Sequence, residues 1–444
     1  MHAPLVIVGS GFAAAAAVVH LVDRGIPCRS LTVIGPATLG TGQAYGCVSP
    51  FFRLNVRPDI QRLWPDQPDH FPQWAKQHIT DPKAHTPVGP FYRRSDFARY
   101  VADQLKRLPD YQELEQIHRR ITHIRPSDGR WILTADDQSN RSADRVVLAT
   151  GNPDPQWPAD IETPEEPTLI RVPWRGDWLE DVDPGSAVCL VGSGLTAMDA
   201  LYALSENGHR GPIYLLSPFG LLPPVQLDWK TIPAVDWPEV KTALEFIRVM
   251  RHALGDDQWL ERRWQERFEA LRIGISLAWQ RLPVNERLKL MRRLGWLWSL
   301  QRFRASPQTV EAAERMIKRG QLVTIKASMT GLAASRAKQW MIALSNGRSL
   351  SCETIINCTG AGRDALIDQL VENRIVGKLN GAGAPSVNAR QEAVAPDGTP
   401  LKTLFVIGAS TGLALGDVVG STSIARQAAR LTDTVWSSGA FQRR

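Results

Sequence analysis

The sequence lacks the cysteine and histidine patterns that mark disulfide frameworks and metal sites. Its 444 residues contain five cysteines, an odd number, and no Cys-x-x-Cys pair. We therefore expect reduced thiols, no disulfide framework and no structural zinc. The nine histidines show no His-x-x-x-His spacing, which argues against a metal site held by the protein.

Long apolar runs are also missing. No stretch approaches the roughly 18 consecutive apolar residues of a membrane-spanning helix. The Ala-rich run at residues 12–22 has the length of the apolar part of a signal peptide, but no Lys or Arg precedes it. We therefore expect folded protein from the first residues onward, no transmembrane segment and a cytoplasmic location.

What the sequence does have is an excess of basic residues. Lys and Arg number 52 against 45 Asp and Glu, a net charge of +7, and much of the excess lies at residues 261–304. A solvated helical surface is the simplest interpretation of this basic stretch. Surface contact with an acidic substrate, nucleic acid or a membrane is the alternative, and the interleaved Trp residues keep a membrane surface open. We expect no nucleic-acid partner.

One local pattern occurs twice. Residues 5–17 read LVIVGSGFAAAAA and residues 188–200 read VCLVGSGLTAMDA. Each is an apolar run typical of a buried parallel strand, then Gly-Ser-Gly, then a stretch typical of a helix. In the first copy, Gly9 takes a turn conformation that a side chain resists, and Gly11 leaves room for a pyrophosphate beside the backbone.

The residues around these glycines complete a dinucleotide-binding pattern. After Ser10, the helix begins near Phe12 and offers its first N–H groups to the phosphate, while Ala14 lets the helix pack close to the strand. The second copy supplies the matching set Gly192, Ser193, Gly194, Leu195 and Thr196. One match is a weak indication of nucleotide binding. This chain is long enough for two or three domains and contains two matches. The repeat therefore predicts two dinucleotide sites, typically for FAD and NAD(P)H.

Two further apolar strands end in Thr-Gly. They read RVVLATG at residues 145–151 and TIINCTG at residues 354–360, and each follows a hairpin-like stretch. Both strand ends agree with dinucleotide binding. The resulting cofactor-binding candidates are Thr150, Gly151, Thr359 and Gly360.

These residues resemble the two-dinucleotide-binding-domain flavoproteins, the group that contains flavin-dependent N-hydroxylases and Baeyer–Villiger monooxygenases. The chain is most similar to a bacterial FAD/NAD(P)-binding branch that has Gly-x-Gly-x-Ala-Tyr (here 40–45) followed by Leu-Asn-Val (54–56). Further matching segments are RSDFARY (94–100), ATGNP (149–153), GLTAMDA (194–200), WSLQRFRASP (298–307) and SIARQA (423–428).

The resemblance implies an α/β fold with two Rossmann-like dinucleotide-binding domains, of which the FAD domain is discontinuous. The first part of the FAD domain would span residues 1–155, the NAD(P)-type domain 156–325, and the second part of the FAD domain 326–444. Apolar residues recur at helix spacing between about 238 and 304, which predicts a helical insertion in the second domain. We expect the Trp residues of this insertion to pack in its core.

Candidate flavin-site residues lie in the matching segments. Asn55 is the first choice for a hydrogen bond to the flavin, with a turn cap as the alternative. Tyr45 either lines the substrate pocket or packs in the core. Asp417, after Gly416, either meets the ribitol or caps a helix, and Arg94 either contacts a phosphate or forms a surface ion pair. The remaining candidates are Gly42, Ala44 and Leu54.

Two strand ends depart from the family pattern. The second strand ends at Gly35, where an acidic side chain usually meets the ribose, so we expect a different ribose contact. The matching strand of the second domain ends in Ser-Pro-Phe-Gly at 217–220, where relatives tend to have arginines that suit the 2′-phosphate of NADPH. Two explanations stay open: other cations (Arg302, Arg304 or Lys230) hold NADPH or NADH, or the second domain is a scaffold.

Three functions follow from this site. The sequence shows no nucleophile or carboxylate pair, as expected where a flavin carries the chemistry. The first hypothesis is an NAD(P)H-using FAD monooxygenase that oxygenates a small-molecule substrate, with N-hydroxylation of an amine as the reaction by analogy of fold. The second is an FAD-dependent oxidase or dehydrogenase reduced by its substrate. The third is a non-catalytic flavin-binding partner protein.

Overall fold

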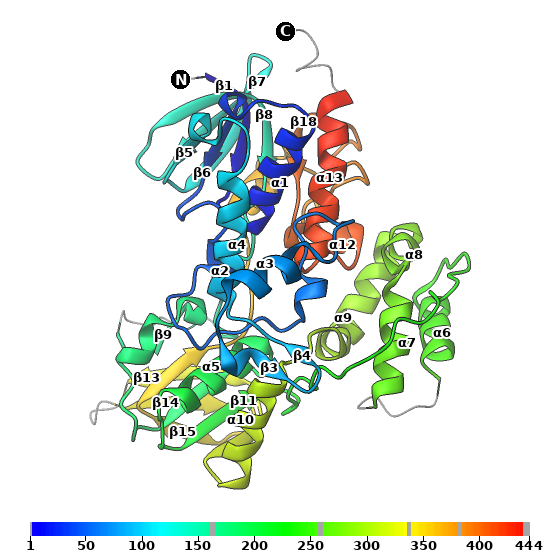
Figure 1. The fold of residues 1–444 in the computed structure, drawn as a ribbon. Helices are drawn as coiled ribbons and strands as arrows, with labels where there is room; N and C mark the ends of the chain where they lie inside the picture. The colour runs from blue at the N-terminus through cyan, green and yellow to red at the C-terminus, as the bar shows by residue number, and fades with distance from the viewer. Residues whose placement is uncertain are drawn as a thin grey trace.

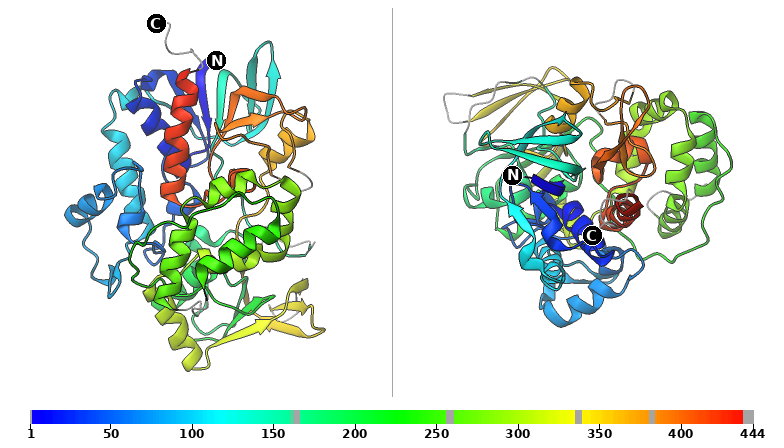
Figure 2. Two further views of the ribbon diagram at one scale, coloured as in Figure 1. Left: turned by 90° about the vertical axis from the view of Figure 1, so that its right-hand side faces the viewer. Right: turned by 90° about the horizontal axis from the view of Figure 1, so that it is seen from above.

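The structure is a computed structural model that describes residues 2–159, 161, 166–255, 261–334, 339–379 and 384–437. Two sheets with parallel central strands lie one above the other, and a group of helices stands beside their junction (Figures 1 and 2). This arrangement confirms the predicted fold class, an α/β protein with two Rossmann-like domains and a helical insertion.

The first sheet is built around β1 (His2–Val8). This strand pairs in parallel with β2 (Leu31–Ile34) on one side and β8 (Asn140–Leu148) on the other. The full order is β17-β18-β8-β1-β2-β5, and a hairpin of β6 and β7 extends from β8. The remaining strands of this sheet are β5 (Glu115–Ile117), β6 (Ile121–Ser127), β7 (Arg130–Ala135), β17 (Glu392–Val394) and β18 (Pro400–Val406).

Successive residues of β1 face opposite sides of this sheet. Leu5 and Ile7 pack in a core with helices, whereas Val6 and Val8 pack in a core with the β6–β7 hairpin and α11. Both faces are therefore covered, as a parallel sheet that is apolar on both sides requires. The helices of the first domain are α1 (Phe12–Asp23), α2 (Gly42–Tyr45), α3 (His70–His78), α4 (Arg94–Lys106), α11 (Ala365–Glu372), α12 (Gly412–Leu415) and α13 (Ser421–Ser437).

The second sheet repeats the plan of the first. Its central strand β10 pairs in parallel with β11 and β16, as β1 pairs with β2 and β8. The five strands, in spatial order, are β12 (Leu322–Lys326), β11 (Ile213–Ser217), β10 (Val188–Val191), β16 (Thr354–Asn357) and β9 (Leu169–Ile170). Helices α5 (Leu195–Glu206) and α10 (Pro307–Lys318) cover one face, and the antiparallel strands β13 (Met329–Ala334), β14 (Trp340–Leu344) and β15 (Ser349–Cys352) cover the other.

The chain returns to the first domain later than the sequence analysis expected. Residue 326 ends β12, a strand of the second sheet, and the next strands up to β16 also belong to the second domain. The chain rejoins the first sheet only after α11, through β17 and β18. The predicted boundary at 326 is therefore wrong. Strands β13–β15 precede β16, the second Thr-Gly strand, and cover the sheet to which β16 belongs. In the same way, the β6–β7 hairpin precedes β8 in the first domain.

The described residues of the predicted helical insertion at 238–304 form four helices. They are α6 (Ala243–Leu254), α7 (Arg262–Arg272), α8 (Ile275–Arg281) and α9 (Val284–Arg302). A separate small core that includes Phe246, Leu271 and Ile275 holds them together. Figure 2 shows the insertion in front of the junction between the two sheets, where α8 contacts α12 of the first domain.

Short elements complete the described chain. A two-stranded ribbon consists of β3 (His85–Thr86) and β4 (Gly89–Pro90). The 3-10 turns are Cys28–Ser30, Pro58–Ile60, Pro82–Ala84, Tyr111–Glu113, Pro173–Arg175, Asp177–Glu180 and Ala409–Thr411. Within the described ranges, every helix is too short or too polar to cross a membrane.

Candidate functional site

The two Gly-Ser-Gly turns have matching geometry. Gly9 has a φ of +121°, and a Cβ placed on it would lie 2.2 Å from Ala149 O, at the end of β8. Gly192 has a φ of +113°, and its Cβ would lie 2.3 Å from Cys358 O, after β16. Both positions need glycine for the fold itself, because a side chain would meet strained backbone and a neighbouring carbonyl.

The second glycine of each turn is not demanded by the protein. Gly11 and Gly194 have φ of −81° and −78°, which any residue can adopt. A Cβ on Gly11 would meet only Gly42 Cα, at 3.8 Å, and one on Gly194 would meet no described atom within 4 Å. Open space beside such a glycine is what a closely bound phosphate requires.

The helices that follow these glycines begin without side-chain partners. Among the described residues, neither α1 nor α5 has a side-chain cap or an acidic residue in its first turn. Their first N–H groups and the positive end of the helix dipole therefore suit an anion. The structure places at these turns the predicted residues Gly9, Ser10, Gly11, Phe12 and Ala14, and Gly192, Ser193, Gly194, Leu195 and Thr196.

The first turn is enclosed by two other glycines. Gly42, in the predicted Gly-x-Gly-x-Ala-Tyr segment, begins α2 with a φ of +50°, and its Cβ would lie 2.7 Å from Gly11 Cα. Gly35 lies against the same turn, and its Cβ would lie 2.6 Å from Ser10 N. The missing acidic residue at position 35 thus has a steric cause, because any side chain would collide with the turn. Ala44 is exposed on α2.

Tyr45 packs among aromatic rings at the end of α2. Its ring centroid is 4.9 Å from that of Phe97 and 6.1 Å from that of Phe12. Burial raises the pKa of Tyr45 to about 12, so the phenol is neutral at physiological pH. Its hydroxyl hydrogen-bonds with Gln61, whose Oε1 accepts from Ser421 Oγ at the start of α13. Tyr45 therefore links α2 to the start of the last helix.

Asn55 has an unsatisfied polar atom near the same helix start. Asn55 Oδ1 is buried and has no hydrogen-bond partner among the described residues. The preceding Leu54 is fixed by its N–H, which donates to Tyr92 O at 2.8 Å. The following turn docks on α13, where Thr422 Oγ1 donates to Ile60 O. A bound group with an N–H donor would satisfy the orphaned acceptor, which fits the predicted flavin contact.

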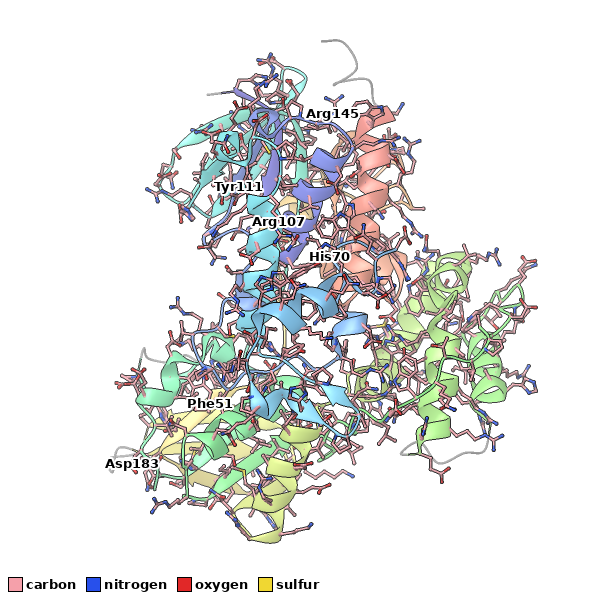
Figure 3. The ribbon with its side chains drawn as sticks, viewed as in Figure 1. Phe51, His70, Arg107, Tyr111, Arg145 and Asp183 are labelled. Carbon is pink, nitrogen blue, oxygen red and sulfur yellow. The ribbon has the colours of Figure 1, made fainter. Side chains whose placement is uncertain are left out.

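Arg94 is engaged by protein groups, in place of the phosphate contact that the sequence analysis expected. It begins α4, its Nε donates to Arg53 O at 3.1 Å, and its guanidinium pairs with Asp199 of α5. Asp199 is only 4% exposed, so the pair is not a surface pair either. The pair joins α4 of the first domain to α5 of the second. Phe51, labelled in Figure 3, also packs on the core of the second domain.

Asp199 predicts a pH dependence of this domain junction. Burial raises the pKa of Asp199 to about 6, although Arg94 opposes the rise. Because the folded pKa lies above the ordinary value, the stabilisation is complete at low pH and is lost as the pH rises through about 6. We expect Asp199→Asn to flatten the fall of the melting temperature between pH 5 and pH 7.5, measured by calorimetry. Asp183→Asn, on the surface of the second domain, is the control and should keep the wild-type slope.

The threonines of the two Thr-Gly ends bind protein groups. Thr150 Oγ1 donates to Asp364, which caps α11 where the chain re-enters the first domain. Thr359 Oγ1 donates to Gln156 O at 2.8 Å, where the chain leaves the first domain. Gly151 and Gly360 have φ of +75° and +91°, and a Cβ on either would meet no described atom within 4 Å. The threonines thus fix the two segments that connect the domains, and the space beside the two glycines stays open.

At the end of β11, where the adenosine of a second dinucleotide would lie, the arginines proposed as phosphate ligands are paired with carboxylates. Phe219 stacks on Trp296 of α9, with ring centroids 4.0 Å apart. Arg302 pairs with Asp417, and Arg304 is buried beside Glu269, so neither points to the end of β11. The second turn therefore lacks the phosphate readers that the sequence analysis considered, apart from the exposed Lys230.

Lys326 is the cation that sequence reasoning missed. It ends β12, where it is the register partner of Ser217 at the end of β11. A Cβ on Gly220 would lie 3.5 Å from Lys326 Cβ, and Lys326 is exposed. Its position follows from the pairing of β12 with β11, which the sequence alone does not reveal, and the predicted domain boundary at residue 326 falls on it.

Asp417 sits in a cluster of charges that docks the insertion on the first domain. Its carboxylate accepts from Arg272 Nε at 2.7 Å and from Arg302 Nε at 3.1 Å. Glu269 pairs with Arg272 at 2.6 Å and with Arg304 at 2.8 Å. Asp417 is therefore held by α7 and α9, in place of the expected ribitol contact or helix cap.

Gly416 permits this docking. It has a φ of +96°, and a Cβ on it would lie 3.0 Å from Ser276 Cα at the start of α8. Only a glycine fits both the conformation and the close approach of the helix. The loop before α13 is thus shaped by the insertion.

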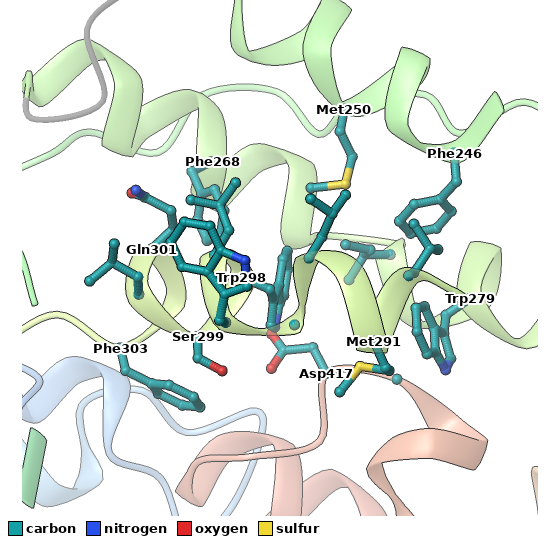
Figure 4. Close-up of a pocket in the computed structure, with 18 of the residues that line it drawn as sticks. Phe246, Met250, Phe268, Trp279, Met291, Trp298, Ser299, Gln301, Phe303 and Asp417 are labelled. Carbon is teal, nitrogen blue, oxygen red and sulfur yellow. The ribbon is translucent and has the colours of Figure 1, made fainter. Parts of the chain in front are cut away.

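A cavity of about 750 Å³ lies between the insertion and residues 409–419 of the first domain (Figure 4). The described residues that line it are mostly apolar and come largely from α6 and α9. Prominent among them are Phe246, Met250, Trp264, Phe268, Trp279, Met291, Leu294 and Trp298. Trp264 is buried in the insertion, whereas Trp279 and Trp298 are partly exposed to this cavity.

Comparison with known proteins agrees with the fold described above. Residues 6–153 match a family described as FAD-NAD(P)-binding, and no curated protein sequence matches the chain. Similar solved structures include ornithine hydroxylase from Pseudomonas aeruginosa (TM-score 0.67, 13% identity, 98% of this chain and 99% of that one). Ornithine N-hydroxylase from Kutzneria sp. 744 (0.64, 14%, 99% and 100%) and bacillithiol disulfide reductase from Staphylococcus aureus (0.57, 11%, 99% and 99%) are also similar.

Proposed function

The chain has the fold of the two-dinucleotide-binding-domain flavoproteins, with an FAD-NAD(P)-binding match at residues 6–153, and we propose that it is an FAD-dependent monooxygenase acting on a small molecule. The observation that carries the proposal is the duplicated turn. Gly11 and Gly194 each leave open space beside a helix that starts without a side-chain cap among the described residues. Two such sites suit one dinucleotide that stays bound and one that delivers electrons.

The residues of the first domain suit FAD. The turn at Gly9 and Gly11, with the start of α1, would hold the diphosphate, and Asn55 would hydrogen-bond the flavin through its orphaned Oδ1. Tyr45 and its aromatic neighbours would keep water from that region, because they are packed and the phenol is neutral. FAD supplies two-electron transfer and the activation of O₂ when bound.

The reaction proposed by analogy of fold is N-hydroxylation of an amine. The solved Kutzneria enzyme carries reduced FAD, NADP⁺ and L-ornithine by its description. For this chain, one amine, one O₂, one NAD(P)H and one proton would yield one hydroxylated amine, one water and one NAD(P)⁺. The two electrons of the nicotinamide and the two of the N–H bond thus reduce O₂ to the level of water.

A spectrum tests the proposal directly. The purified protein should be yellow, and NADPH or NADH added without oxygen should bleach the flavin within seconds to minutes. A flavin that neither nicotinamide reduces would contradict NAD(P)H-dependent oxygenation. A colourless protein that takes up no added FAD would contradict the cofactor itself.

Lys326 predicts the choice of nicotinamide. Its Cβ lies beside the Ser217–Gly220 loop, so its side chain has the position from which its ammonium would meet the 2′-phosphate of NADPH. We expect Lys326→Ala to raise the KM for NADPH about tenfold, because a charge-assisted contact contributes on the order of 1.4 kcal/mol. The KM for NADH should not change. Lys318→Ala, on the nearby α10, is the matched control, and equal effects on both nicotinamides would refute the assignment.

A substrate-reduced oxidase or dehydrogenase is the second candidate. The observation in its favour is the stack of Phe219 on Trp296, which stands at the strand end where the family resemblance led us to expect arginines. A yellow protein that nicotinamides leave oxidised, while an amine bleaches it without oxygen, would support this function.

A further inference from the structure

The cavity beside the insertion has the size of a ligand site. Its volume of about 750 Å³ falls in the range of roughly 300–1,000 Å³ that is common for small-molecule pockets. It adjoins Gly416 and Asp417 in the loop between α12 and α13, and α13 is tied through Ser421 and Gln61 to Tyr45. The cavity is therefore next to the region in which the proposed function places the flavin.

The walls of this cavity suit flat apolar groups. Figure 4 shows Trp298 in the middle, Phe268 towards one end, and Phe246 and Trp279 at the other. The rings and the thioethers of Met250 and Met291 offer adaptable apolar contacts. An aromatic molecule would bury most of its surface here.

The charges around the cavity disfavour a cation. Among the described residues, the charged side chains that line it are Arg251 and Asp417. Asp417 already accepts from Arg272 and Arg302. With Arg304 and Glu269, its cluster contains three guanidinium groups and two carboxylates, which sum to one positive charge. A free amino acid with an ammonium side chain would find no available carboxylate.

Two further residues indicate an occupant. Gln301 lines the end of the cavity near Phe268, and its buried Oε1 has no partner among the described residues, so a donor in the cavity meets it only when the side chain turns inward. Such a buried acceptor is costly unless a donor meets it. Gly295 lies inside α9, where glycine weakens a helix, and its Cβ would point at Met291 Cε, 3.4 Å away. The small residue keeps the cavity wide at this point.

We propose that this cavity binds a neutral, largely aromatic amine, whose ring packs against Trp298 and Phe268 and whose N–H donates to Gln301 Oε1 once that side chain has turned into the cavity. The inference rests on the proposed function only in identifying this occupant as the substrate. An aromatic amine is uncharged at neutral pH, so it avoids the desolvation of an ammonium ion. The cavity therefore selects against ornithine and lysine, although the fold is shared with enzymes named for them.

Calorimetric titration of the FAD-loaded protein tests the binding directly. The probes are 1-naphthylamine, 1-methylnaphthalene, which has the same shape without an N–H donor, and L-ornithine. We expect micromolar to submillimolar binding of 1-naphthylamine and no measurable binding of L-ornithine. Binding of L-ornithine as tight as that of 1-naphthylamine would overturn the proposal.

Two test variants, Gly295→Phe and Gln301→Leu, locate the probe, and Arg293→Phe is the control. Gly295→Phe should weaken 1-naphthylamine binding at least tenfold by filling the cavity, whereas Arg293→Phe, on the exposed face of the same helix, should not. Gln301→Leu should lower the affinity ratio of 1-naphthylamine to 1-methylnaphthalene about fivefold, as expected for one hydrogen bond of about 1 kcal/mol. Circular dichroism and bound flavin show that each variant is folded. Unchanged binding in both folded variants would place the probe elsewhere and defeat the inference.

The same samples separate this inference from the proposed function. Flavin that NAD(P)H bleaches, together with an unresponsive cavity, would refute the cavity assignment and leave the monooxygenase. Specific naphthylamine binding in a protein whose flavin ignores nicotinamides would keep the cavity and remove the monooxygenase.

Discussion

Gly11→Ala is expected to yield folded protein that purifies without FAD. The added methyl group meets only Gly42 Cα, at an ordinary contact distance of 3.8 Å, so the fold itself tolerates it. It would, however, occupy the space beside the start of α1 that a diphosphate needs. We expect at least a tenfold loss of FAD affinity, measured as the 450 nm absorbance per protein and by titration of FAD into the apoprotein.

The other turn glycines are the matched controls. Gly194→Ala should keep FAD at wild-type occupancy but slow reduction by NAD(P)H, because the methyl group fills the equivalent space in the second domain. Gly9→Ala should give little soluble protein, since its Cβ would lie 2.2 Å from Ala149 O. A Gly11→Ala protein with full flavin would show that the cofactor does not lie on this turn.

The local patterns were the part of the structure that the sequence could predict. Gly9 and Gly192 lie within four residues of the strands and helices that they join, so the turn, its conformation and the helix starts follow from adjacent residues. Apolar periodicity also predicted a helical insertion between about 238 and 304, although not the separate helices α8 and α9. In both cases the physical cause is close in sequence to its effect.

Partners distant in sequence could not be predicted. Arg94 lies 105 residues from Asp199, and Asp417 lies 145 residues from Arg272, so their roles depend on how the domains dock. The sequence left Arg94 open between a phosphate contact and a surface ion pair, and Asp417 between a ribitol contact and a helix cap, whereas in the structure both form ion pairs at junctions. The predicted domain boundary was wrong for the same reason. Packing between distant residues decides which sheet β13–β15 cover, and the sequence of these strands does not reveal it.

Lys326 and Gln301 could not be recognised from the sequence, and the reason differs between the two residues. Lys326 becomes a candidate only when β12 is known to lie beside β11, which a single sequence does not reveal. Gln301 becomes one only when its Oε1 is seen to be buried and without a partner among the described residues. The chemistry of the proposed substrate therefore rests on tertiary placement, while the proposed cofactor rests on the turns.

Asp417→Asn is expected to lower stability by about 3 kcal/mol at neutral pH, because it leaves Arg272 and Arg302 without their shared carboxylate in a mostly buried cluster. Burial by itself would raise the pKa of Asp417, but the charges of Arg272 and Arg302 outweigh it and hold this pKa below its ordinary value of 3.8. A depressed folded pKa means that the stabilisation is complete above the unfolded pKa and is lost as the pH falls through the folded one.

The wild-type melting temperature should therefore exceed that of Asp417→Asn by several degrees at pH 7, and the gap should close below about pH 3.8. Differential scanning calorimetry across this range provides the measurement, and Asp417→Glu, which keeps the charge, should recover part of the loss. Asp433→Asn, an exposed position on α13, controls for loss of an acidic group. If Asp417→Asn melts with the wild type at pH 7, the cluster does not hold the insertion against the first domain, and the cavity between them has no fixed wall.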